Sequence, residues 1–288
     1  MSSRADQCFE WPGASGPLSV RLYHAGVRST GLLVFFPPGG FARADLDMTD
    51  GCAKDFALAC GVSVLTATHA LAPSHPFPAA IEDAHAVLRV AARRRHTLQG
   101  WTGGHLLVGG IEAGGNLAAA AALMSRDRAG PNLSGQILMM PMLDPSMRHC
   151  AETAAADALA LSSPRHRQAL QSLALAYRDY LPRGVDRMHP YACPLESTRL
   201  AGLPPALLIG LRGDPLSAAA CTYSRRLEAA GVAVERRLLD PLDAAGGDER
   251  CIAAAQPACV AAVTDFLAAC LQRPAGALNH SSARTTTP

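Results

Sequence analysis

The sequence has no long apolar run and carries little charge. No apolar segment approaches the roughly eighteen residues that a membrane span requires, and the N-terminal stretch MSSRADQCFEWPG has no apolar segment behind a basic start. Charged residues make up 17% of the chain, and the net charge is +2. The short basic run Arg93 to Arg95 is not interleaved with aromatic residues, as a nucleic-acid-binding face would be. We therefore expect a soluble, cytoplasmic protein that neither spans a membrane nor binds nucleic acid.

Cys-x-x-Cys spacing is also absent. The nine cysteines are an odd number in a long chain without a recognisable secretory signal, which predicts free thiols. Several lie in alanine-rich helical patterns, where cysteine behaves as a small buried apolar residue. His69, His75 and His85 are six and ten residues apart, and the first two flank a proline-containing loop, which favours loop or surface roles over a metal site. We expect no metal and no cofactor.

Length and pattern indicate one α/β domain, over residues 1–273. With 288 residues and 49% hydrophobic content, the chain can bury one large core. Strand-like and helix-like segments alternate, which implies crossover connections, a doubly wound and mostly parallel sheet, and helices on both faces. The expected strands are 18–23, 31–36, 62–66, 105–109, 135–140, 206–211 and 232–239, and the expected helices are 50–60, 79–95, 114–125, 218–230 and 256–271.

Three segments have local features of their own. Residues 146–190 interrupt the alternation and predict a small helical cap insertion, with an amphipathic helix from about Pro164 to Tyr180. Residues 274–288 have the small, polar composition of a disordered tail. In the helix 79–95, Glu82 and Asp83 lie in the first turn and arginines in the last, which suits the helix dipole.

The stretch GGIEAGGNL, residues 109–117, has the pattern of a strand, a glycine-tight turn and a helix. Such a turn raises a nucleophilic serine at the end of a central strand in many hydrolases, yet the raised residue here is Glu112. Gly109, Gly110, Gly114 and Gly115 do not form a dinucleotide-binding motif, because their spacing differs and no acidic residue ends a suitable following strand.

Four segments, in order, resemble the hormone-sensitive-lipase branch of the α/β-hydrolases. They are THALAPSHPFPAAIEDA, FPPGGF, GIEAGGNLAA, and LPPALLIGLRGDPL followed by YSRRLEAAGVAVE, and the match extends from about residue 18 to residue 271. The resemblance implies the α/β-hydrolase fold and, as family activity, hydrolysis of carboxylic esters by a serine, a histidine and an aspartate, with backbone N–H groups holding the oxyanion.

The resemblance places Glu112 at the position of the nucleophile and Asp214 at that of the acid. It places Gly39, Gly40 and Ala113 at the positions of the three oxyanion-hole donors. Among these five positions, only the nucleophile position carries a residue that differs in chemistry from the family pattern, because a glutamate stands there in place of serine.

The catalytic histidine has no match. It should follow the strand 232–239, but the loop there reads DPLDAAGGDER, and His280 in the tail is the only histidine beyond Asp214. Other polar positions of the family pattern have also changed, while apolar and glycine positions have stayed. The changed positions are Pro37, Pro38, Ala70, Ser74 and Ile111.

A carboxylate on the turn can be assessed physically. A helix N-terminus stabilises an anion by about 0.3 to 1 kcal/mol, so Glu112 can fill the anion site itself. It would repel an oxyanion about 4 Å away by roughly 4 kcal/mol at an effective dielectric constant near 20. We expect an esterase-like protein with impaired catalysis that keeps a pocket for a small apolar or ester-like ligand or a partner. The alternative is an active hydrolase or lyase that uses Glu112 as nucleophile or general base.

Overall fold

The computed structural model describes residues 5–26, 29–148, 164–242 and 248–273. Within these ranges, eight strands form one sheet in the order β1-β2-β4-β3-β5-β6-β7-β8. The strands β3 to β8 run parallel to one another, whereas β2 is antiparallel to β1 and to β4. The strands are β1 Gln7–Pro12, β2 Pro17–Tyr23, β3 Ser29–Phe36, β4 Ser63–Ala67, β5 Trp101–Ile111, β6 Gly135–Met139, β7 Ala206–Leu211 and β8 Val234–Leu239.

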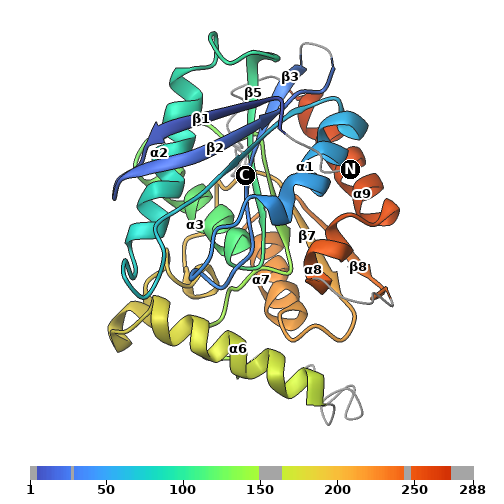
Figure 1. The fold of residues 1–288 in the computed structure, drawn as a ribbon. Helices are drawn as coiled ribbons and strands as arrows, with labels where there is room; N and C mark the ends of the chain where they lie inside the picture. The colour runs from blue at the N-terminus through green and yellow to red at the C-terminus, as the bar shows by residue number, and fades with distance from the viewer. Residues whose placement is uncertain (1–4, 27–28, 149–163, 243–247, 274–288) are drawn as a thin grey trace, which may run out of the picture.

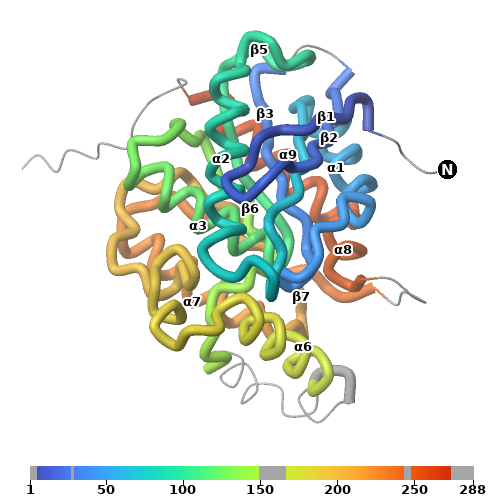
Figure 2. The backbone as a smooth tube through the Cα atoms, turned by 60° about the vertical axis from the view of Figure 1, so that its left-hand side comes forward, coloured from blue at the N-terminus to red at the C-terminus, as the bar shows by residue number. Residues whose placement is uncertain are grey.

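Helices cover both faces of this sheet (Figures 1 and 2). The helices α1 and α9 pack against each other on one face, and α2 and α3 pack against each other on the other face. The helix α6 lies across one end of the sheet. The α-helices are α1 Asp47–Cys60, α2 Ala79–Arg93, α3 Ala113–Asp127, α6 Pro164–Tyr180, α7 Ser217–Ala229, α8 Glu249–Ala254 and α9 Pro257–Leu271, and the 3₁₀ helices are Gly184–Met188 and Pro194–Glu196.

The predicted α/β-hydrolase fold, with its mostly parallel sheet between helices, is confirmed. The central strands β4, β6 and β7 are buried along their whole length, as expected for strands covered on both faces. The predicted cap helix has the bounds of α6, Pro164–Tyr180. Part of the predicted cap insertion, 149–163, and the predicted tail, 274–288, lie outside the described residues.

Asp83 has a different role from the predicted stabilisation of the α2 dipole. Its side chain is fully buried, and among the residues of the first turn only Glu82 is acidic. One carboxylate oxygen of Asp83 accepts hydrogen bonds from the backbone N–H groups of Ala14 (2.7 Å) and Ser15 (3.1 Å). The other accepts one from the N–H of Ala70 at 2.8 Å. Asp83 therefore joins the β1–β2 turn and the loop after β4 to the start of α2.

We predict that Asp83→Ala lowers the free energy of unfolding by about 3 kcal/mol or more, because three backbone N–H groups lose a buried charged acceptor. Urea denaturation followed by circular dichroism measures this loss. Glu82→Ala is the matched control: its carboxylate pairs with Arg128 at the surface, with 33% and 43% of the two side chains exposed, and we expect a cost below about 1 kcal/mol. Equal losses for the two variants would contradict the role of Asp83.

Candidate active site

The turn after β5 holds Glu112 in a strained conformation at the end of the central strand. The φ and ψ angles of Glu112 are 57° and −113°, and α3 begins at the next residue. Two glycines make this turn possible. A Cβ on Gly110 would lie 2.4 Å from the carbonyl group of Gly114, and a Cβ on Gly114 would lie 2.1 Å from the carbonyl oxygen of Phe36. Strain of this kind costs on the order of 1 to 3 kcal/mol and is typical of functional turns.

The loop after β3 presents two backbone N–H groups to the Glu112 carboxylate. The N–H groups of Gly39 and Gly40 donate to Glu112 Oε2 at 2.7 Å and 3.0 Å. Both glycines have positive φ angles, 139° and 59°, and a Cβ on Gly39 would lie 2.4 Å from the carbonyl oxygen of Arg43. The carboxylate thus occupies the place where the resemblance puts the oxyanion of a reaction intermediate.

Arg250 links the two predicted catalytic carboxylates. Its Nη1 lies 3.2 Å from Glu112 Oε1, and its Nε lies 2.7 Å from Asp214 Oδ2. A further hydrogen bond, 3.4 Å long, joins Nη2 to Asp214 Oδ1. Glu112, Arg250 and Asp214 therefore form a continuous ionic chain, which we call the Glu–Arg–Asp chain.

The position of Arg250 follows from a helix cap. Asp248 is the N-cap of α8, and its side chain accepts hydrogen bonds from the backbone N–H groups of Arg250 (2.9 Å) and Cys251 (3.2 Å). Aspartate is a preferred N-cap residue because it satisfies the free N–H groups of the first turn. The cap fixes the start of α8 and directs the arginine of its first turn toward Asp214.

Burial and charge keep Arg250 protonated. Only 14% of its side chain is exposed, with 11% for Glu112 and 6% for Asp214. Burial by itself lowers the pKa of the Arg250 guanidinium, but the charges of Asp214 and Glu112 and the hydrogen bond to Asp214 more than offset burial, so the pKa is raised overall. A guanidinium has no acceptor atom and does not give up its proton in proteins. Arg250 therefore cannot act as the general base that a serine hydrolase requires.

Asp214 also orders its own loop. Its Oδ1 accepts a hydrogen bond from the backbone N–H of Leu216 at 2.8 Å, just before α7 begins. The same oxygen accepts the weaker bond from Arg250. Asp214 thus both caps its loop and binds the cation of the site.

Aromatic side chains join the cap helix α6 to the oxyanion loop. Phe41 stacks on Tyr180, with ring centroids 3.7 Å apart and an interplanar angle of 7°, and Phe77 packs edge-on against Tyr180. A Cβ on Gly40 would lie 3.0 Å from Cβ of Ala176 in α6. The helix α6 therefore packs directly against the loop whose N–H groups bind the Glu112 carboxylate.

The structure brings together Glu112, Asp214, Gly39 and Gly40, as the resemblance requires. Ala113 is fully buried at the start of α3, and within the described ranges its N–H makes no hydrogen bond to the Glu112 carboxylate. Sequence reasoning missed Arg250. The available signal was its place in DPLDAAGGDER, the segment where the resemblance puts the catalytic histidine.

The known proteins to which this chain is similar are α/β-hydrolases, which agrees with the fold described above. A family model described as alpha/beta hydrolase fold matches residues 33–241. The chain is 34% identical to the carboxylic ester hydrolase LipN of Mycobacterium tuberculosis over 237 residues, which are 80% of this chain and 61% of LipN. It is 33% identical to the esterase LipI of the same organism over 231 residues, 77% of this chain and 69% of LipI. The chain thus spans about three fifths to two thirds of these relatives.

Solved structures of esterases have the same fold. A thermostable esterase from Pseudomonas putida superposes with a TM-score of 0.79 at 25% identity, over 93% of this chain and 83% of that chain. An esterase from Pyrobaculum calidifontis superposes with a TM-score of 0.76 at 27% identity, over 92% and 84%.

We predict that Arg250→Met lowers the free energy of unfolding by about 3 to 5 kcal/mol, because it leaves two buried carboxylates without their cation. In a double-mutant cycle with Glu112→Gln, the second substitution should recover part of this loss, with a coupling energy above about 1 kcal/mol. Urea denaturation of the four proteins measures both quantities.

Arg212→Met is the matched control. Arg212 pairs with Asp240 at the surface, where 62% and 76% of the two side chains are exposed, and we expect a loss below about 1 kcal/mol. Strict additivity of Arg250→Met and Glu112→Gln would show that the two side chains do not interact in solution.

Proposed function

Because the chain belongs to the α/β-hydrolase-fold family, in the branch similar to hormone-sensitive lipase, we propose that it is an esterase-like member with impaired catalysis. Its site keeps a pocket for a small apolar or ester-like ligand or a partner. The observation that carries this proposal is the Glu–Arg–Asp chain, which stands where the family has serine, histidine and aspartate.

Three features of the site oppose ester hydrolysis. The N–H groups of Gly39 and Gly40, which would stabilise an oxyanion, already bind the Glu112 carboxylate. An oxyanion formed beside that carboxylate would be repelled by roughly 4 kcal/mol at 4 Å and an effective dielectric constant near 20. The group beside the nucleophile position is a guanidinium, which accepts no proton.

Retention of a ligand site is supported by the solvent access that the Glu–Arg–Asp chain keeps, with 14% of the Arg250 side chain and 11% of the Glu112 side chain exposed. Ala176 of α6, which is only partly buried, lies beside Gly40 and gives this opening an apolar side. The polar chemistry of the site has changed, whereas Gly39 and Gly40 keep the pattern of the family's oxyanion loop. The names of the relatives point to esters, and an ester-like ligand for this chain is part of the proposal.

We also propose a cytoplasmic location. All eight cysteines within the described ranges are free thiols, which suits a reducing compartment. In the same ranges, no helix has the length and apolar character that crossing a membrane requires.

The experiment is an assay of purified protein with 4-nitrophenyl acetate, beside Glu112→Ser and the double variant Glu112→Ser/Arg250→His. We expect no turnover by the natural chain and little by Glu112→Ser, because a base is still absent. The double variant frees the oxyanion donors and places an imidazole between the introduced serine and Asp214. Its kcat/KM should exceed that of Glu112→Ser by about 100-fold, the usual contribution of general-base catalysis.

Glu112→Ala separates the proposal from carboxylate chemistry. Hydrolysis by the natural chain that disappears in Glu112→Ala would overturn the proposed impairment and support Glu112 as nucleophile or general base. In the natural chain, Arg250 neutralises the Glu112 carboxylate and holds it in a fixed pair, which weakens both of those roles.

A further inference from the structure

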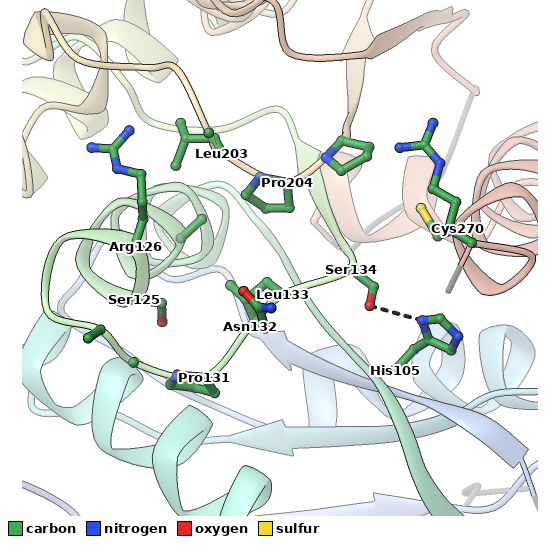
Figure 3. A pocket seen from close by; sticks show the side chains of 16 residues that line it. His105, Ser125, Arg126, Pro131, Asn132, Leu133, Ser134, Leu203, Pro204 and Cys270 are labelled. Atoms are coloured by element: carbon green, nitrogen blue, oxygen red, sulfur yellow. Dashed lines mark hydrogen bonds between the residues drawn. The ribbon is translucent and has the colours of Figure 1, made fainter. Parts of the chain in front are cut away.

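A pocket lined by His105 lies at the other end of β5 from Glu112, and Figure 3 shows its lining side chains. Its volume is about 540 Å³, within the range of small-molecule sites. It is bounded by the end of α3, the loops that lead into β6 and β7, and the end of α9. We call it the amino-end pocket, because β6 and β7 begin there.

The amino-end pocket is separate from the candidate active site. His105 of β5 lines it, whereas Glu112 follows the last residue of the same strand. The six residue-to-residue steps from His105 to Ile111 span roughly 20 Å at the usual rise of a strand. Ligands of open α/β sheets usually bind at the carboxyl ends of the strands, so a ligand here would use a different surface.

The pocket contains buried polar side chains, and not all of them have a hydrogen-bond partner among the described residues. The Ser125 hydroxyl has no hydrogen-bond partner among the described residues, although only 4% of the residue is exposed. Figure 3 shows this hydroxyl directed toward the loop that carries Pro131. His105 is 7% exposed, and its Nδ1 lies 3.0 Å from Ser134 Oγ. Burial lowers the pKa of His105, which favours a neutral ring that can share this hydrogen bond.

The charges around the pocket are positive. Its lining includes Arg126 and Arg273 and no acidic residue. Asp127 forms ion pairs with two guanidinium groups, those of Arg126 (2.7 Å) and Arg199 (3.3 Å). Its single negative charge cannot neutralise both. In the part of the chain that the structure describes, no carboxylate forms an ion pair with Arg273.

Arg273 is the cation available to a ligand. The donors of Arg126 are already engaged by Asp127 and by the carbonyl oxygens of residues 199 and 201. Arg273 follows Cys270 by three residues, and Cys270 Sγ lies 2.9 Å from where a Cβ on Gly135 would stand. The guanidinium of Arg273 therefore belongs to the end of the pocket that holds Ser134.

Apolar side chains make up much of the remaining lining. They are Leu133, Leu203, Pro204 and Pro205. In Figure 3, Leu203 and Pro204 face the Ser125 and Pro131 side across the pocket. A cationic end joined to an apolar wall is complementary to a molecule with one anionic group and a short apolar body.

We propose that the amino-end pocket binds a small organic anion. The anionic group lies beside Arg273 and the Ser134–His105 pair, and the apolar body packs on Leu203 and Pro204. The buried hydroxyl of Ser125 then gains a polar partner if the ligand carries one at its far end. This site is independent of the function proposed for the Glu–Arg–Asp chain.

The test is ligand-observed saturation-transfer NMR on the full chain with sodium hexanoate and hexanol as probes, and with inorganic phosphate, which has no observable protons, as a competitor of hexanoate. We expect saturable binding of hexanoate, weaker binding of hexanol, and weaker binding of phosphate, which lacks the apolar body. Arg273→Gln should weaken hexanoate binding about tenfold or more, the usual effect of losing a charge-assisted contact. Arg237→Gln removes an exposed arginine from the edge strand β8 and should leave the affinity unchanged.

Several results would overturn the proposal. Equal affinity for hexanoate and hexanol would show that the anionic group is not recognised, and equal affinity for hexanoate and phosphate would show that the apolar wall is not used. Hexanoate binding that Arg273→Gln leaves unchanged would place the ligand elsewhere on the protein. The absence of saturable hexanoate binding would remove the site altogether.

Discussion

The candidate active site depends on one interaction: a carboxylate held by two backbone N–H groups where a hydrolase would hold a reaction intermediate. Glu112 supplies that carboxylate from the chain itself, at 2.7 Å and 3.0 Å from the N–H groups of Gly39 and Gly40. The anion-binding geometry is thus intact and already occupied. A substrate carbonyl would have to displace a covalently attached anion that Arg250 also holds in place.

The residues that replace the family's catalytic groups complement one another. A glutamate at the nucleophile position, with Asp214 nearby, would put two carboxylates in a largely buried site, and such charges are costly unless they are paired. Arg250 resolves this conflict by pairing with both. A neutral histidine in its place would leave both carboxylates without a cation. The glutamate and the arginine therefore act together with Asp214 as one ionic unit.

The sequence predicts the scaffold better than it predicts this pairing. Buried runs such as Gly31 to Phe36 and the glycine turn at Gly109 to Gly115 carry local signals, and the structure has a strand and a strand–turn–helix there. The helix α8 has only six residues, too few for a helical period to be recognised, and the edge strand β1 ends in a proline. Arg250 was missed because its role depends on partners 36 and 138 residues away in the chain.

The two ends of the sheet now differ in what they can offer a ligand. At the carboxyl end, the strongest polar groups, Glu112, Arg250 and Asp214, are bonded to one another, so few free polar groups are left there to recognise a ligand. At the amino end, Ser125 and Arg273 have groups that the described part of the chain leaves without a hydrogen-bond or ion-pair partner. Because polar specificity requires unsatisfied donors and acceptors, discrimination between charged and neutral ligands belongs to the amino end of this fold.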